Sequence, residues 1–265
     1  VNRRTIVALD LPLPMKDKLV KSPLSLVVCQ VRHEEISAVS DANRVLQLHS
    51  EVKNQYPLLE QQYGQSLTIS AGPGGVQQDQ QRLERGWRMK SSDGWNVVIM
   101  PNFFSLETTS YTEWEEFRER TEIIIQLISK ILSPQLEQRI GIRYINHIRV
   151  PGVNTPRSWL EKIDAAFLGP IGHEVLGSAV VENQQVTQFD LAEGRVAIVR
   201  HGTTRDISAR EDNYVYIIDQ DCFSQRGHAF RQDDVCNEVA ALHTLQLQVF
   251  QQAITGKFLE YLRGE

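Results

Sequence analysis

Alternation of apolar and polar residues predicts a β-strand near the middle of the chain, at residues 139–150. Its even positions are mostly apolar, and its odd positions carry its basic residues. Because successive side chains of a strand point to opposite faces of a sheet, this strand has one apolar face and one basic face. The basic face consists of Arg139, Arg143, His147 and Arg149.

A first strand and two helices are predicted upstream of it. The nearly continuous apolar run at residues 24–33 is typical of a strand near the middle of a covered sheet. Apolar residues that recur at spacings of three and four predict amphipathic helices at 41–54 and 113–132. Both helices would place one apolar side against a sheet.

A hairpin is predicted between these helices. Two strand-like runs, at 83–90 and 95–100, flank the turn Ser91-Ser92-Asp93-Gly94. Asp and Gly both tolerate a positive φ, so this pattern favours a β-hairpin. The Gln- and Gly-rich segment 60–81, which precedes the hairpin, is interpreted as a long polar connection.

The second half repeats the same kinds of element. A short helix is predicted within 156–167, followed by strands at 175–191, 195–201 and 214–219. A long helix is then predicted over 233–262, with a kink or break at Gly256.

This order of elements predicts an α+β fold. Strand, helix, two strands, helix and strand is the ferredoxin-like plan, with an antiparallel sheet and helices on one face. We predict two ferredoxin-like βαββα units packed as one body. Residues 1–21 would form an N-terminal arm, 22–150 the first unit, and 137–265 a second unit that shares or abuts strand 139–150.

Composition narrows the function classes. The chain has 265 residues, a formal net charge of −5 and a pI of about 5.9, whereas general nucleic-acid binders are more often basic. The three cysteines, Cys29, Cys222 and Cys236, have no metal or redox spacing and are expected to be reduced thiols. No secretory signal or long apolar segment is evident, so a cytoplasmic location is expected, with no membrane partner.

Six stretches together resemble a sporadically distributed bacterial family of uncharacterised proteins of about 260 residues. The combination Arg-x-Gly-x-Arg-Tyr-x-Asn, followed at a distance by Asp-x-Asp, is its most specific part. The stretches are Val27–Glu34, Ser91–Gly94, Ser105–Phe117, Arg139–Asn146, Ile218–Asp221 and His243. The resemblance implies no activity, cofactor or catalytic residue. The patchy distribution of the family is typical of antiviral defence and toxin–antitoxin genes.

Two sets of residues are candidates for chemistry. Asp219 and Asp221 lie two apart at the end of a predicted strand and can hold a divalent ion if a third carboxylate converges on them. Candidates for that carboxylate are Asp190, Asp93 and Glu107. His147 and His201 can instead act as an acid–base pair on RNA, with Arg143 or Arg149 on the phosphate.

The basic face of strand 139–150 leaves three interpretations open. Its arginines can pair with carboxylates of the same chain, bind an acidic protein, or bind nucleic acid. The absence of any catalytic motif favours a non-enzymatic protein-interaction or regulatory module without a cofactor. The alternative is a nucleic-acid-binding or nucleotide-processing enzyme that uses Asp219 and Asp221 or the histidines.

Overall fold

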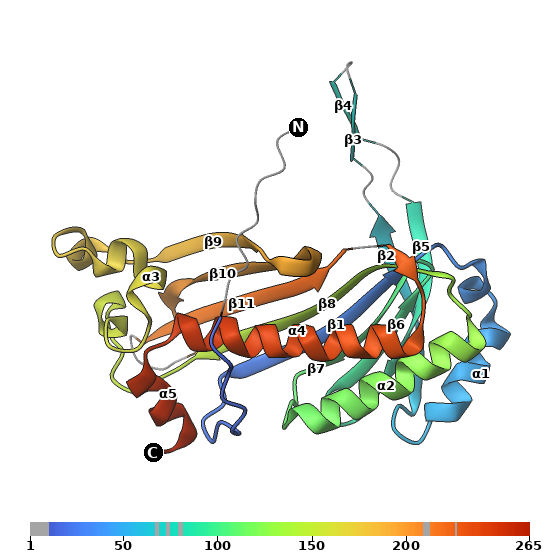
Figure 1. The fold of residues 1–265 in the computed structure, drawn as a ribbon, viewed down its shortest axis with the longest axis horizontal. Coiled ribbons are helices and arrows are strands. Elements are labelled where there is room, and N and C mark those ends of the chain that lie inside the picture. The colour runs from blue at the N-terminus through green and yellow to red at the C-terminus, as the bar shows by residue number, and fades with distance from the viewer. Residues whose placement is uncertain (1–10, 67–68, 73–74, 79–81, 209–212, 226) are drawn as a thin grey trace.

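The computed structural model describes residues 11–66, 69–72, 75–78, 82–208, 213–225 and 227–265. Its main element is one antiparallel sheet with the order β2-β5-β6-β7-β1-β8-β11-β10-β9 (Figure 1). The central strands are β1 (Leu24–His33) and β8 (Leu136–Ile148). The others are β2 (Leu58–Ser66), β5 (Arg82–Lys90), β6 (Trp95–Met100), β7 (Phe103–Thr108), β9 (Asn183–Asp190), β10 (Arg195–Arg205) and β11 (Tyr214–Ser224).

Strand β8 covers most of the predicted strand 139–150, beginning three residues earlier and ending at Ile148, and joins the two halves of the chain. It pairs with β1 on one side, where Ile142 lies opposite Cys29. On the other side it pairs with β11, where Arg143 lies opposite Asp221. A short strand, β12 (His228–Ala229), also pairs with its beginning. Both halves therefore belong to one continuous sheet.

The two halves have a similar order of elements around the β1–β8 pair. In the first half β1 is followed by α1 (Ala42–Val52), by strands that return from the sheet edge to β1, and by α2 (Trp114–Ile131). In the second half β8 is followed by short helical segments, by β9, β10 and β11, and by α4 (Gln232–Ala253). The α+β class is thus found, but the first half has four strands of the main sheet, and the separate β3–β4 pair, between its helices among the described residues, more than the ferredoxin-like plan.

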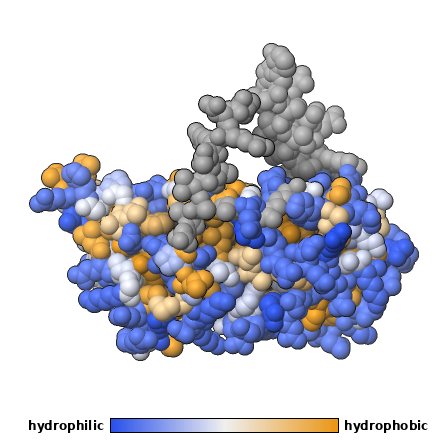
Figure 2. Space-filling view, viewed as in Figure 1, coloured by the Kyte–Doolittle hydropathy of each residue, from blue (hydrophilic) through white to orange (hydrophobic). Residues whose placement is uncertain are grey.

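The helices cover one face of the sheet (Figure 1). From the central strands, Val27, Cys29, Ile140 and Ile142 belong to the buried core on this side, which we call the helix face. Figure 2 shows that the molecule is mainly hydrophilic over α1 and α2, as expected for amphipathic helices whose apolar sides face the sheet. The other side of the sheet, here called the open face, contributes no central-strand residue to this core within the described residues.

Two polar or short segments form strands that the sequence analysis did not predict. The Gln-rich segment was wrongly interpreted as a connection: Leu58–Ser66 pairs with β5 along its whole length, and Ile69–Gly72 (β3) pairs with Gly75–Gln78 (β4). An edge strand needs backbone pairing more than apolar side chains. The strand β7 was missed because only a two-residue turn separates it from β6.

Three elements predicted in the second half have different bounds in the structure. The predicted strand 175–191 is a strand only over β9, because residues 176–179 form a 3-10 turn. The short helix within 156–167 is a 3-10 turn, Pro156–Trp159, separated from a single helical turn, α3 (Ala165–Leu168). Strand β11 continues past Asp219 to Ser224, since it pairs there with both β8 and β10. Asp219 and Asp221 therefore lie within a strand, not at its end.

The predicted long C-terminal helix is broken, as expected near Gly256. Ile254 is extended and bridges to Ile163, and the Thr255 hydroxyl then caps α5 (Gly256–Arg263) by accepting a hydrogen bond from Phe258 N. The described part of the N-terminal arm, residues 11–21, contains no helix or strand and lies against α4 and α5 (Figure 1).

Candidate functional site

The arginines of strand β8 form a row of ion pairs on the open face. Arg143 makes two hydrogen bonds to Asp219, from Nε at 2.7 Å and from Nη2 at 2.6 Å. Arg139 Nη2 bonds both oxygens of Asp221, at 2.8 and 3.0 Å. The hydrogen bonds with Asp219 raise the pKa of the Arg143 guanidinium. Pairing within the chain, one of the three interpretations, is therefore found.

These ion pairs remain partly accessible from solvent. The Arg143 side chain is 44% exposed, while that of its partner Asp219 is 12% exposed. Arg200 of β10, 46% exposed, lies 4.0 Å from the same carboxylate. The Asp219 carboxylate thus lies beneath the guanidinium groups of Arg143 and Arg200, whereas Asp221, at 23% exposed, is slightly more accessible than Arg139, at 17%. Around Asp219 the open face presents mainly arginine to solvent.

The row continues with His147, near the end of β8, and Arg149, the residue directly after the strand. Arg149 Nε bonds Asp206 Oδ2 at 2.6 Å. Burial lowers the pKa of His147, and the nearby Arg149 charge lowers it further. His147 is therefore a neutral neighbour of the row at pH 7 rather than another cation.

The aspartate pair is not arranged as a metal site. Asp219 and Asp221 each use their carboxylate oxygens on an arginine. Among the described residues, no group of three His, Cys, Asp or Glu side chains is placed to hold a metal ion. Asp190, Asp93 and Glu107 consequently complete no site around the pair.

His147 and His201 lie on opposite faces of the sheet. His147 pairs with Ile217 in the β8–β11 ladder, and Ile217 pairs with Gly202, the neighbour of His201. His201 is buried on the helix face with its Nδ1 3.0 Å from the Tyr216 hydroxyl. Burial lowers its pKa to about 4. The structure therefore does not bring the two histidines together as an acid–base pair.

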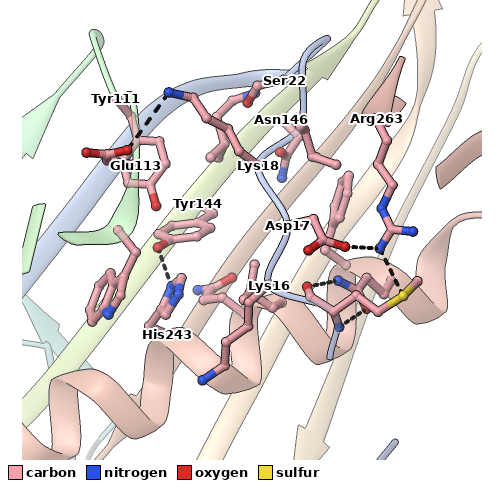
Figure 3. Close-up of a pocket in the computed structure, with 18 of the residues that line it drawn as sticks. Lys16, Asp17, Lys18, Ser22, Tyr111, Glu113, Tyr144, Asn146, His243 and Arg263 are labelled. Carbon is pink, nitrogen blue, oxygen red and sulfur yellow. Dashed lines mark hydrogen bonds and ion pairs between the residues drawn. The ribbon is translucent and has the colours of Figure 1, made fainter. Parts of the chain in front are cut away.

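A cavity of about 200 Å³ lies on the helix face, between the N-terminal arm, the start of α2, strand β8, α4 and α5. We call it the arm pocket. The arm is held over it by side chains of the C-terminal helices (Figure 3). Gln251 bonds both the backbone N–H and the carbonyl of Met15, at 3.0 and 2.7 Å, and Arg263 pairs with Asp17 at 3.1 Å.

Aromatic rings and His243 form one wall of the arm pocket. The His243 ring stacks on Trp114 with centroids 3.8 Å apart and an angle of 4°, and its Nδ1 lies 2.8 Å from the Tyr144 hydroxyl. Tyr111 packs against Tyr144 with centroids 6.0 Å apart. Burial, with a smaller contribution from Lys16, lowers the pKa of His243 to about 3, and burial raises that of Tyr111 to about 12.

Two residues that line the arm pocket have a polar atom without a hydrogen-bond partner. Gln246 is fully buried, and its Nε2 donates to the carbonyls of Ile142 and Gln220 at 2.6 and 3.0 Å. Its Oε1 has no partner, and neither does Arg263 Nε. Buried polar atoms are nearly always satisfied, so these two are unusual.

The sequence analysis assigned no role to this pocket. Several of its aromatic residues, such as Trp114, Tyr144 and Phe250, occupy apolar positions of predicted elements, where an aromatic side chain indicates core. A signal was present in Gln246, a polar residue within the apolar side of the last helix. A second was the resemblance itself, because Ser105–Phe117, Arg139–Asn146 and His243 all contribute to the pocket.

Comparison of the chain with protein-family models and with curated proteins found no match. Within the described residues, no helix has both the length and the apolar content needed to cross a bilayer.

Proposed function

We propose that this protein is a non-enzymatic interaction module. Its open face would bind an acidic and partly apolar surface on another protein. The observation that carries the proposal is the arrangement of this face. The part of this face on β8 lies outside the main hydrophobic cluster of the described residues, yet the face combines an ordered row of ion pairs with apolar side chains.

The apolar component of the open face surrounds the ion pairs. Ile145 of β8 and Ile217 of β11 are half-buried, and Val186 of β9, opposite Arg200 in the ladder, is 68% exposed. Exposed apolar residues next to ordered charged groups are common in protein interfaces. Burial of this surface by a partner would add the hydrophobic contribution that the sheet lacks on this side.

The charge pattern favours an acidic protein over nucleic acid. The Arg143 fork already binds Asp219 through Nε and Nη2, which leaves two N–H groups on Nη1 and one on Nη2 for further contacts. Phe223, an aromatic residue on this face, lies under Arg139 at 4.3 Å and is not free to stack on a base. The antiviral defence or toxin–antitoxin setting that the resemblance implies would supply a protein partner of this kind.

Photo-crosslinking tests the proposal. A photoreactive amino acid at Val186 is expected to give protein adducts in cells that express the protein natively, because this side chain is exposed beside Arg200. The matched control places the same amino acid at Gln126, an exposed position of α2. Mass spectrometry identifies the adducts. Nucleic-acid adducts alone, or equal protein adducts from both positions, would contradict the proposal. Nucleic-acid adducts alone would favour the alternative, a nucleic-acid-binding protein.

Neutralising the exposed arginines is expected to weaken the contact. The double substitution Arg143→Gln, Arg200→Gln should reduce the affinity for the crosslinked partner about tenfold, since it removes two accessible cations from the interface. Isothermal titration calorimetry with the purified partner measures the change. Arg118→Gln on α2, 53% exposed, is the control and should leave the affinity unchanged.

A further inference from the structure

We propose that the arm pocket binds a small aromatic molecule that carries an anionic group and a hydrogen-bond donor. This site lies on the helix face, on the side of the sheet away from the proposed protein contact, and does not depend on that proposal. Three features of the pocket determine the chemistry of the ligand: its size and walls, its buried acceptor, and its cations.

The size of the arm pocket and its aromatic walls favour a ligand with a single ring. A cavity of about 200 Å³ is slightly larger than the roughly 150 Å³ that encloses a benzene molecule in a protein core. Tyr111, Trp114 and Tyr144 supply aromatic faces and edges, while Leu247 and Phe250 of α4 supply apolar surface. Aromatic rings favour stacked or edge-to-face contacts with other rings, so a planar ligand fits these walls better than a branched one.

The buried acceptor, Oε1 of Gln246, favours a ligand that carries a hydrogen-bond donor. Gln246 is held in one orientation, because its Nε2 donates to two strand carbonyls. Its Oε1 therefore cannot exchange places with the amide nitrogen and remains an acceptor without a donor. An unsatisfied buried acceptor is unfavourable, and a hydroxyl or N–H of the ligand would satisfy it.

The basic side chains that line the pocket, Lys16, Lys18 and Arg263, favour a ligand with a negatively charged group. In Figure 3, Lys16 reaches from the arm toward the helix that carries His243. Lys18 pairs with Glu113 and Arg263 with Asp17, but Lys16 has no ion-pair partner within the described part of the chain. A carboxylate at this side of the pocket would meet the Lys16 ammonium group.

Four related probes separate these features. They are 4-hydroxybenzoate, which has the ring, the donor and the anion; benzoate, which lacks the donor; 4-hydroxybenzyl alcohol, which lacks the anion; and tyramine, which carries a cation instead. Calorimetry and saturation-transfer NMR on the full chain should show that 4-hydroxybenzoate binds best. Benzoate and 4-hydroxybenzyl alcohol should each bind about tenfold more weakly, and tyramine should show no binding.

Two substitutions assign any binding to the pocket. Leu247→Trp fills the cavity and should abolish 4-hydroxybenzoate binding, whereas Leu46→Trp, at a half-exposed position of α1, should bind as the unmodified chain does. Lys16→Met should weaken 4-hydroxybenzoate about tenfold and leave 4-hydroxybenzyl alcohol unchanged. Circular dichroism confirms that each variant folds. Absence of binding by every probe, strongest binding by tyramine, or binding that persists in folded Leu247→Trp would each overturn the proposal.

Discussion

Replacement of Ile142 by alanine is expected to lower the free energy of unfolding by about 2–5 kcal/mol, the range for removing a large buried aliphatic side chain. Ile142 is fully buried on the helix face of β8, between Cys29 of β1 and Cys222 of β11. Its carbonyl accepts a hydrogen bond from Gln246 Nε2, which holds the backbone in place. The backbone therefore cannot move in to fill the cavity that the substitution leaves. Urea denaturation at neutral pH measures the loss.

Ile145→Ala, three residues along the same strand, is the matched control. Ile145 faces the open side and is half-buried, so the same truncation should cost about 1 kcal/mol or less. The difference between the two variants therefore reports whether the two faces of the sheet differ in packing. Equal losses would mean that the open face is covered in solution, by a second copy of the chain or by another segment, and is not available to a partner.

The main features of strand β8 could be predicted from the sequence because they are local. Alternation along a single strand determines which side chains share a face, so the arginine row followed directly from residues 139–149. The partners of the arginines could not be assigned in the same way. Asp219 and Asp221 are separated from Arg143 by more than seventy residues, and only the β8–β11 register places them beside it.

Elements whose existence depends on neighbours were predicted least well. Strand β2 is polar and exposed at its edge, so its hydrophobic pattern is weak, and pairing with β5 determines its structure. The arm pocket has the same origin. Its residues come from the N-terminal arm, α2, β8, α4 and α5, and each looks like an ordinary core or surface position within its own element. The order of the strands in the sheet brings these residues together, and the sequence pattern of a single element does not reveal that order.

Acidification from about pH 8 to about pH 5 is expected to remove about 2 kcal/mol of stability through His243, and a similar amount through His201. Burial lowers the pKa of His243 from 6.5 to about 3, and that of His201 to about 4. In the unfolded chain both imidazoles take up a proton as the pH falls through 6.5, while in the folded chain they stay neutral. The unfolded state therefore binds more protons in this window, and stability decreases as the pH falls.

His243→Phe should remove the contribution of His243 to this pH dependence. Phenylalanine keeps a ring against Trp114 but cannot titrate, so the stability lost between pH 8 and pH 5 should be smaller by about 2 kcal/mol. Because the substitution also removes the contact with the Tyr144 hydroxyl, the variant can be less stable at every pH. The difference between the two pH values is thus the quantity that matters, measured by urea denaturation. The control, His228→Gln, changes a histidine that is 64% exposed and should retain the full acid sensitivity. A loss of the same size in His243→Phe would show that His243 is protonated in the folded protein at pH 5, and that the wall of the arm pocket is open to water.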